Sequence, residues 1–484
     1  MTTTFGNLFQ PKKTFVKTTE LAPDLPNNYL DDPAISTLVE AISNPGPKWG
    51  GVYFVSGRAG TGKSTFVRYL QHLKDINTIV VAPTNLAAIN IQGATLHKTF
   101  ELPIGIVNKE RILNKPMRRK SVLANVERII IDEASMVRCD ILDGIHWRLQ
   151  EIKQNDLPFG GVQIIMIGDP LQLPPVATNE AEDILAALGY ETKYVFSSKS
   201  LRNLPAHIYT IDKVWRQQNL DFISILSDIR VNNHRTLEKQ LKTLNKACWR
   251  QHRPDHVPVL LVPTNKQAAS HNRTGLLKHI QTTGCTLKDV LSFSSQTAGS
   301  FAQETTTKDP APRNLKLVPG CRVMLTKNLT TELYNGRMGT FLKKGARKDK
   351  HGKIQVYLLV QFDKSPRPTR VYQNTWQDIT YSWNAREQKI QEEHKGTFEQ
   401  YPLNLAYALT IHKSQGMTLS DVRVDTGQGA FEYGQIYVAL SRATSMEGLS
   451  LENPLTPEDI RTDPDLLELL LRANQTPHYN ITKV

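Results

Sequence analysis

The stretch 52-VYFVSGRAGTGKSTFVRYLQHL-73 decides the fold class of this chain. It joins an apolar, β-branched run to the pattern GxxxxGK[ST] and then to residues with helical periodicity, which is the context that this pattern requires. Its glycines let successive N–H groups curl around a phosphate at a helix N-terminus, where the helix dipole adds positive potential. A chance glycine turn is the alternative, and the flanking strand and helix argue against it. The stretch therefore predicts a nucleoside triphosphate site.

The residues of this loop have predicted roles. Lys63 is expected to neutralise the β- and γ-phosphate oxygens of ATP, and the Ser64 hydroxyl to ligate Mg²⁺. The predicted nucleotide-binding set is Gly57, Gly60, Thr61, Gly62, Lys63, Ser64 and Thr65.

A second motif, IIIDEAS at 129–135, supplies the acids that hydrolysis needs. The aliphatic run places Asp132 at the carboxyl edge of a sheet, where it can hold Mg²⁺ together with Ser64. Glu133 can then orient and deprotonate the attacking water. No acceptor pocket for a small molecule is signalled, so ATP hydrolysis is favoured over phosphoryl transfer to a metabolite.

Short β-branched runs alternate with helical stretches around these motifs, as TIVVAP, RIIIDE and VQIIMIGD show. This alternation predicts an α/β fold with a parallel sheet and crossover helices. The tripeptide at 83–85, Pro-Thr-Asn, returns at 263–265, each time after an apolar strand. The echo suggests two related α/β domains with a phosphate-binding helix start in each; ordinary N-caps are the alternative.

Composition narrows the class of protein. The 484 residues carry 59 Lys and Arg against 46 Asp and Glu, a net charge of +13 that suits a polyanionic partner. The four cysteines lack metal-ligand spacing, which favours reduced thiols. No apolar stretch reaches the roughly 20 residues of a membrane span, and no secretory signal is recognisable. We expect an intracellular protein of the cytoplasm or nucleus without membrane contact; mitochondrial targeting is weakly supported, because the first 20 residues contain lysines but no arginine.

Eight motifs in order resemble one family. They are GRAGTGKST, APTNLAA, TLHKTF, IIIDEAS, GDPLQLPPV, VWRQ, LAYALTIHKSQGMTL and YVALSRATSMEGL. The chain resembles a superfamily 1 helicase and, within that group, the petite integration frequency (PIF) family related to RecD, over nearly all of residues 50–450. The resemblance implies α/β architecture with two RecA-like P-loop domains, parallel sheets with helices on both faces, and ATP between them. It also implies a motor that moves 5′-to-3′ on single-stranded DNA and unwinds duplexes in replication, recombination or repair.

The expected domain layout follows from the local pattern of strand-like and helix-like runs together with the family resemblance. A flexible tail over 1–33 precedes a first RecA-like domain over 34–206, with a small strand-separating wedge insertion at about 101–120. The second RecA-like domain comprises 207–309 and 401–484, and a small β-barrel-like insertion covers 310–400.

The resemblance also assigns roles to single residues. Gln172 would sense the γ-phosphate, with Pro170, Pro174 and Pro175 stiffening its segment so that a shift reaches the DNA-facing surface. Arg216 and Arg442 would be arginine fingers reaching the γ-phosphate from the far side of the cleft. The DNA-contacting set would be Thr84, Asn85, His97, Phe100, Thr264, Asn265, His412, Ser414 and Gln415. Phe100 or His97 could stack on a base, or could belong to the core.

Several alternatives stay open. An RNA helicase or transposition-associated motor, and a nucleotide-gated binding protein that does not unwind, share the same site. Lys63, Glu133 and Arg442 favour turnover over binding alone. The expected partners are single-stranded DNA and single/double-strand junctions, with replication proteins as an extension and a monomer as the working unit. The stretch YLDDPAISTLVEAI lacks the glutamine that the family uses to contact adenine, which leaves base selectivity open.

Overall fold

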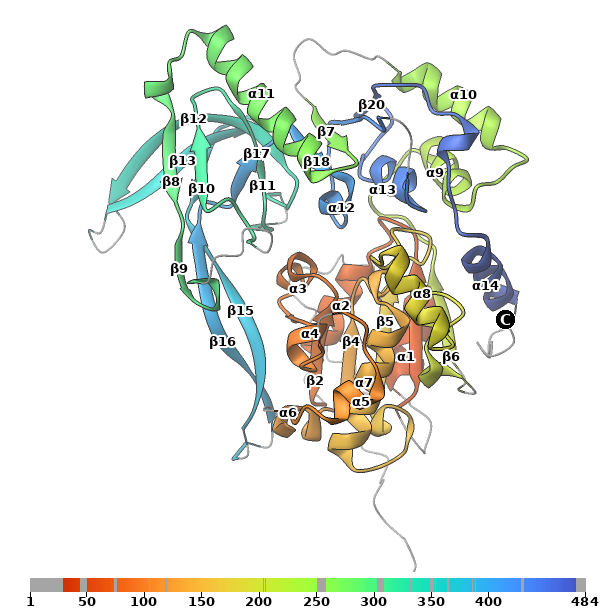
Figure 1. Ribbon diagram of the computed structural model, residues 1–484. Coiled ribbons are helices and arrows are strands. Elements are labelled where there is room, and N and C mark those ends of the chain that lie inside the picture. Colours follow the sequence, from red (N-terminus) through yellow and green to blue (C-terminus); the bar gives the residue numbers. More distant parts are fainter. Residues whose placement is uncertain are drawn as a thin grey trace, which may run out of the picture.

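The computed structural model describes residues 29–475 apart from the segments 44–49, 74–75, 104, 118–119, 203, 205, 250–257, 303–308, 331, 349–351, 353, 364, 385, 388 and 428–430. Two α/β domains lie one above the other in Figure 1, with a β-rich insertion at the upper left. Among the described helices, none is both long enough and apolar enough to cross a membrane.

The first domain is built on a six-stranded sheet in which every strand runs parallel to its neighbours. The order is β3 (Ala94–Thr95), β2 (Thr78–Ala82), β4 (Arg128–Ile131), β5 (Gln163–Gly168), β1 (Val52–Gly57) and β6 (Ala206–Ile211). Side chains alternate between faces, so Val52 and Phe54 enter one core while Tyr53 and Val55 enter the other. A sheet buried on both faces explains why its strands read as continuous apolar runs.

Helices cover both faces of this sheet. α1 (Pro33–Ser43), α2 (Lys63–His72) and α3 (Asn85–Asn90) pack on one face. The other face carries α4 (Leu96–Thr99), α5 (Lys109–Leu113), α6 (Lys120–Asn125) and α7 (Cys139–Lys153). A further helix, α8 (Asn179–Ala187), packs through Leu185 against Cys139 at the start of α7.

Two expected boundaries of this domain are wrong. The division between 206 and 207 would cut off β6, which pairs with β1 over its whole length and so belongs to the first domain. The expected tail over 1–33 ends too late: Tyr29 is only 1% exposed and donates a hydrogen bond to the carbonyl of Gly62, so residues 29–33 are part of the folded domain. Residues 1–28 lie outside the described part of the chain.

The second domain has a parallel sheet in the order β18 (Ala408–Thr410), β7 (Val259–Val262), β19 (Val422–Val424) and β20 (Leu449–Leu451). Its helices are α9 (Leu220–Val231), α10 (Leu237–Cys248), α11 (Asn265–Thr283), α12 (Ile411–Ser414) and α13 (Gln435–Leu440). The predicted α/β class with two P-loop-type domains is confirmed.

The insertion is larger than expected, because its pairing begins at Leu291 and ends at Leu405. β11 (Arg322–Leu325), β12 (Met338–Lys348), β13 (Ile354–Phe362), β14 (Thr369–Tyr372) and β17 (Leu403–Leu405) form an antiparallel sheet, and β8 (Leu291–Ser294) pairs with β10 (Asn314–Leu317). The two sheets share a core that includes Leu315, Phe341 and Leu358. The described strands do not close into a barrel, so the expected barrel is replaced by two packed sheets.

A long arm of the insertion reaches the first domain. β15 (Asn374–Asn384) pairs with β16 (Lys389–Gln400), and β16 also pairs with β9 (Gln296–Gly299). β15 and β16 run downward beside α3, α4 and α6 in Figure 1. Lys98 forms an ion pair with Asp378 of this arm at 2.5 Å. The insertion therefore touches both α/β domains.

Two more segments pack against the first domain. In the segment expected to be a wedge, Val107 and Ile112 are buried in the first domain, and the Asp140 carboxylate of α7 accepts a hydrogen bond from the Val107 N–H at 2.7 Å. The helix α14 (Pro464–Gln475) returns from the second domain to the first, where Leu466 packs in a cluster with Leu171. The segment 401–484 is thus not confined to one domain.

Candidate nucleotide site between the two domains

The phosphate loop joins β1 to α2. Gly60 and Gly62 have φ values of 81° and 86°, a left-handed backbone that turns the loop before Lys63 begins the helix. The Lys63 ammonium donates to the carbonyl oxygens of Gly57 at 2.7 Å and Arg58 at 2.9 Å. This places its charge over the mouth of the loop, where phosphate oxygens could replace the carbonyls as its partners.

Three carboxylates face this ammonium from the ends of neighbouring strands. Asp132 follows β4, and Asp169 follows β5, which lies between β4 and β1. Burial, followed by the charge of Glu133, raises the pKa of Asp132 to about 7. Burial lowers the pKa of Lys63, while Asp169, Glu133 and Asp132 oppose that shift. One ammonium and three carboxylates thus lie together beside the phosphate loop.

Glu133 sits in an unusual backbone conformation. Its φ is 51°, which is left-handed for a residue with a side chain. Strain of this kind, of order 1–3 kcal/mol, persists where neighbouring structure enforces it and clusters at functional sites. Here the conformation directs the carboxylate toward the second domain, where the Gln415 amide donates to its Oε2 at 2.9 Å.

Asp169 is held by an arginine of the second domain. Arg230, on α9, donates to both carboxylate oxygens, with the shortest contact at 2.7 Å. Burial alone would raise the pKa of Asp169, but the charges of Arg230 and Lys63 hold it below its usual range. The pair therefore fastens the GDPLQLPPV segment to the second domain.

Replacing Arg230 with alanine is expected to destabilise the protein by about 3–5 kcal/mol at neutral pH, since a buried carboxylate would lose its partner. Burial would then raise the pKa of Asp169, so the deficit should grow as the pH rises above the ordinary carboxyl value of 3.8. Thermal unfolding between pH 4 and 8 measures this effect. Arg423→Ala, which breaks the more exposed pair with Glu452, is the control and should cost no more than about 1 kcal/mol. Equal losses in both variants at every pH would contradict the assignment.

Gln172 and Gln415 meet across the domain interface. The Gln172 amide donates to Asp169 Oδ2 at 3.1 Å, and its carbonyl oxygen accepts from the Gln415 amide at 3.5 Å. Glu133, Gln415, Gln172, Asp169 and Arg230 thus form one continuous chain of side chains. Gln415, expected to contact DNA, donates its amide hydrogen to the Glu133 carboxylate in this structure.

The two predicted arginine fingers lie together at the interface. Burial, with the charge of Arg442 next in effect, lowers the pKa of Arg216 to about 9, and burial also lowers the pKa of Arg442. Arg442 is 1% exposed and donates to the Val438 carbonyl at 2.9 Å, within the second domain. Arg216 does not come from the far side as expected: its backbone N–H donates to the Gly60 carbonyl, and its guanidinium reaches the Ser441 carbonyl at 3.0 Å.

The second domain closes directly on the phosphate loop. The Tyr437 hydroxyl of α13 accepts a hydrogen bond from the Ala59 N–H at 2.9 Å, and Ala59 and Leu173 are both buried in the second domain's core cluster. Gly434, with φ of 69°, lies so close to the carbonyl of Leu171 that a Cβ there would approach its oxygen to 2.5 Å. Neither domain can move without changing contacts at the nucleotide site.

Apart from Gln415, the predicted DNA-contacting residues divide into three groups, which are the Thr-Asn pairs, the two histidines, and Phe100 with Ser414. Thr84 and Thr264 cap α3 and α11 at the carboxyl ends of β2 and β7, so each hydroxyl accepts a helix N–H, and Asn85 and Asn265 are the first residues of those helices. His97 and His412 are half-buried. Burial lowers the pKa of His412, so this ring stays neutral at physiological pH.

Two members of the DNA-contacting set are wrong. Phe100 is 0% exposed in the first domain's core, so its ring cannot stack on a base. Ser414 is also 0% exposed, and its hydroxyl donates to the Ile411 carbonyl at 2.7 Å. Both side chains serve local packing.

The sequence analysis assigned no role to four residues of the site. Arg230 and Tyr437 stand in segments that resemble the family, DFISILSDIR and YVALSRA, so the signal for them was present. Tyr29 and Trp215 pack with ring centroids 6.1 Å apart beside Gly62, and no local pattern marks Tyr29.

The site fits a magnesium ion bound through phosphate and water. No cluster of three or more His, Cys, Asp or Glu suitable for a metal occurs among the described residues. Mg²⁺ commonly takes one or two protein oxygens and keeps waters and substrate phosphates. The exposed Ser64 at the start of α2 and Asp132 at the end of β4 offer such oxygens.

The fold and this site place the protein in the P-loop class with two RecA-like domains. A family model described as PIF1-like helicase matches residues 32–239, and one described as Helicase matches residues 386–477. The chain belongs to the PIF1-like helicase family.

Individual relatives agree with this membership. The crystal structure of Bacteroides sp Pif1 in complex with ADP-AlF4 is 30% identical, covers 93% of this chain and 98% of its own, and has a TM-score of 0.79. Bacteroides Pif1 bound to ssDNA is 28% identical, covers 94% and 99%, and has a TM-score of 0.63. The human ATP-dependent DNA helicase PIF1 is 31% identical over 421 residues, 86% of this chain and 60% of the human protein. The chain thus spans about 60% of the length of the curated relatives it matches.

Proposed function

We propose that this protein is an ATP-dependent DNA helicase that translocates 5′-to-3′ on single-stranded DNA and unwinds duplexes. The observation that carries the proposal is the convergence of Lys63, Asp132 and Glu133 at one sheet edge, with two arginines at the adjoining interface. Such a set suits turnover, because a protein that only bound nucleotide would not need a water-activating acid or cations for γ-phosphate charge. Relatives named as DNA helicases support DNA as the substrate.

In this proposal each group has one task. Lys63 and the loop amides bind the β- and γ-phosphates, and Ser64 and Asp132 hold Mg²⁺, which would neutralise phosphate charge. Glu133 orients the attacking water and takes its proton. Arg216 and Arg442 stabilise charge that develops on the γ-phosphate oxygens, which is where preorganised donors accelerate a reaction most.

Thr84, Asn85, His97, Thr264, Asn265 and His412 are proposed to guide the DNA strand. The Thr and Asn pairs begin helices on the two domains, so backbone N–H groups there can bind successive phosphates. Contacts of this kind carry no sequence information, which suits a motor. We propose a monomer as the working unit and a role in replication, recombination or repair inside the cell.

The test of the proposed function uses paired duplexes that carry either a 5′ or a 3′ single-stranded tail, each in a DNA and an RNA version. ATP-dependent strand separation is expected only from the 5′-tailed DNA substrate. Separation from 3′ tails alone would contradict the direction, and faster unwinding of the RNA version would assign the protein to RNA. Nucleotide-dependent binding without separation of any substrate would reduce the protein to a gated binding module.

Gln415 is proposed to couple the DNA strand to hydrolysis. Gln415 directly follows the short helix α12, which carries His412. The Gln415 amide donates to the Glu133 carboxylate oxygen that an attacking water would use. When a strand engages the α12 segment and draws Gln415 away, Glu133 becomes available to water. The Gln172 carbonyl oxygen accepts from the same Gln415 amide. Gln172, which is proposed to sense the γ-phosphate, would therefore affect the contact between Gln415 and Glu133.

Gln415→Ala is accordingly expected to raise ATP hydrolysis without DNA by about three- to tenfold, which corresponds to one hydrogen bond of about 0.7 to 1.4 kcal/mol, and to shrink the stimulation by DNA. Steady-state rates with and without oligonucleotide measure it. Gln281→Ala, the same substitution at an exposed position near the end of α11, is the control. A fall of both rates in equal proportion would make Gln415 a simple part of the catalytic machinery.

A further inference from the structure

The helix α10 and the turn before it carry two sets of side chains with the same spacing. Leu237, Leu241, Leu244 and Cys248 are buried against the second domain, at intervals of four, three and four residues. On the exposed side, Arg235, Lys239, Lys242 and Lys246 follow the same intervals, two positions earlier. Lys239, Lys242 and Lys246 share one face of the helix and form a row on its surface, and Arg235 lies in the turn just before the helix.

This row is largely uncompensated. Lys242 pairs with Glu238 at 2.7 Å, whereas no acid in the described part of the chain forms an ion pair with Arg235, Lys239 or Lys246. A second nearby acid, Asp228, is engaged by Asn233, Thr236 and Gln240. Those bonds fix the turn before α10, so the row stands on a rigid support.

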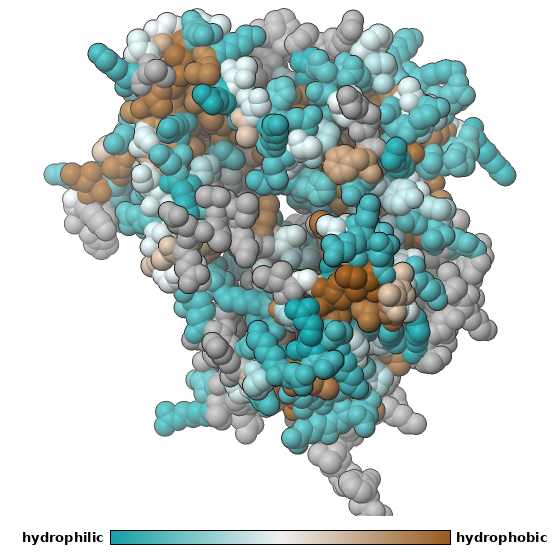
Figure 2. All heavy atoms as spheres, in the orientation of Figure 1, coloured by the Kyte–Doolittle hydropathy of each residue, from teal (hydrophilic) through white to brown (hydrophobic). Residues whose placement is uncertain are grey.

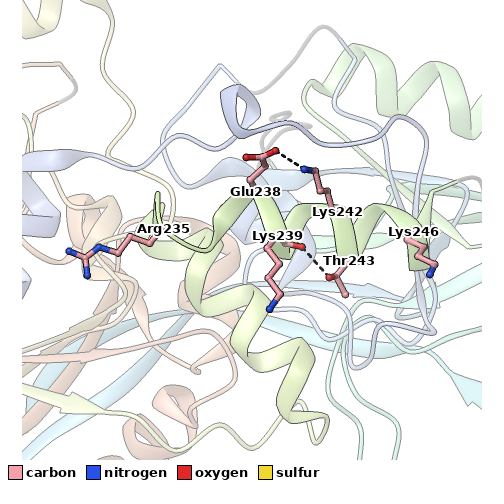
Figure 3. A pocket seen from close by; sticks show the side chains of 6 residues that line it. All are labelled: Arg235, Glu238, Lys239, Lys242, Thr243 and Lys246. Carbon is pink, nitrogen blue, oxygen red and sulfur yellow. Dashed lines mark hydrogen bonds and ion pairs between the residues drawn. The ribbon is translucent and has the colours of Figure 1, made fainter.

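The row borders a hollow and ends at an aromatic ring. Arg235, Glu238, Lys239, Lys242, Thr243 and Lys246 line a shallow hollow of about 480 Å³, and Figure 3 shows Lys239 and Lys246 pointing to the same side of the helix. Trp249 follows at the next interval of three and is 42% exposed. In Figure 2 the surface over α10, at the upper right, is mostly hydrophilic.

Cations beside an exposed indole match the chemistry of an unpaired nucleic-acid strand. Lysine and arginine neutralise phosphates, and an aromatic ring stacks on a base with about 1–3 kcal/mol. From Lys239 to Cys248 the helix rises about 14 Å, which leaves room for a few nucleotides of an unpaired strand. An acidic peptide would need the cations but not the ring, and a duplex offers no unstacked base along its length.

The surface is separate from the proposed path of the tracked strand. α11 packs on β18 and β7, whereas α10 packs on β20 at the other edge of the sheet ordered β18-β7-β19-β20. Figure 1 likewise places α10 at the upper right, away from α3 and the arm of the insertion. A strand on α10 is therefore a second segment, and for a motor that splits duplexes two unpaired segments are at hand.

We propose that the α10 face, formed by Arg235, Lys239, Lys242, Lys246 and Trp249, is a second binding surface for single-stranded nucleic acid, distinct from the tracked path. The inference rests on the proposed function for the identity of the polyanion. The α10 face holds the strand through its phosphates and one stacked base, without recognising the base sequence.

The test compares wild type with a variant carrying Arg235→Ser, Lys239→Ser and Lys246→Ser. A six-nucleotide strand should bind both proteins almost equally, because it is too short to occupy both surfaces at once and is expected to bind the tracked path first. A long strand of about 40 nucleotides should bind the variant roughly tenfold more weakly at 0.1 M salt, with a log–log salt slope smaller by about 2, from 0.7 for each of three phosphates. The rate of ATP hydrolysis at saturating DNA should stay unchanged. The matched control replaces three exposed lysines elsewhere, Lys278, Lys288 and Lys316, with serine.

Trp249→Phe gives a second readout, since quenching of tryptophan fluorescence by the long strand should lose the part that this ring contributes. Equal binding of the long strand by the triple variant and wild type would overturn the proposal. So would an equal loss in the control triple, which would show only a net-charge effect, or stronger competition by a blunt duplex or a poly-glutamate peptide than by single strands. Absence of unwinding in the wild type would defeat the proposed function without changing these binding results.

Discussion

Replacing Lys63 with alanine is expected to lower DNA-stimulated ATP hydrolysis by about 100- to 1,000-fold, the cost of removing one preorganised group that stabilises developing charge. The physical reason lies in its surroundings. Its ammonium is positioned over the loop by the carbonyls of Gly57 and Arg58, and three carboxylates face it. Without it, phosphate oxygens would meet those acids with no cation between them.

The same variant should bind a single strand without nucleotide as well as wild type does, within about twofold, because no proposed DNA contact touches Lys63. Phosphate release gives the rate, and fluorescence anisotropy of a labelled oligonucleotide gives the affinity. Lys109→Ala, at an exposed site on α5 in the same domain, is the control. Hydrolysis that survives in Lys63→Ala would remove the phosphate loop from the mechanism.

Replacing Arg442 with alanine is expected to reduce the hydrolysis step by about 1,000-fold or more, which is the usual contribution of an arginine finger. Because charge on the γ-phosphate oxygens grows only as the bond breaks, ATP affinity should change far less than the rate. Arg442 is 1% exposed, and its guanidinium donates hydrogen bonds to the Val438 carbonyl and the Ser441 hydroxyl, so it is already held in place before reaction.

Single-turnover hydrolysis and nucleotide binding should be measured together for this variant, with thermal unfolding to detect any loss of fold. Arg442→Lys keeps the charge without the planar fork and should recover only part of the rate. Arg423→Ala, on β19 of the same domain, is the matched control. A parallel loss of ATP affinity and rate would make Arg442 a ground-state binding residue. Arg216→Ala should behave similarly if the two arginines act on the same charge.

Much of the nucleotide site was readable from local sequence. Gly60, Gly62 and Lys63 stand between an apolar strand and a helix, and Asp132 and Asp169 follow apolar strands directly. Parallel strands in one sheet end at one edge, so residues that follow them converge without further information. The same reasoning placed Thr84 and Thr264 correctly at helix starts.

The failures have a common cause, because each concerns which face of a short element meets which distant partner. Phe100 and Ser414 belong to motifs that resemble a DNA-contacting family, yet their side chains turn into the core. The boundary at 206 failed because β6 pairs with β1, about 150 positions earlier in the chain. Composition in a short window carries no information about such pairing.

The sequence by itself determined the α/β class, the phosphate loop, the acids at the strand ends and the family, since these depend on periodicity and on spacing within a few turns. Only the tertiary structure decided that Gln415 lies against Glu133, that Arg230 holds Asp169, that Arg216 bridges the loop and the second domain, and that Tyr29 belongs to the fold. Three of these contacts join different domains, and all four link segments far apart in the chain. They depend on how two sheets pack, and the free energy of that packing is summed over many residues that no single motif contains.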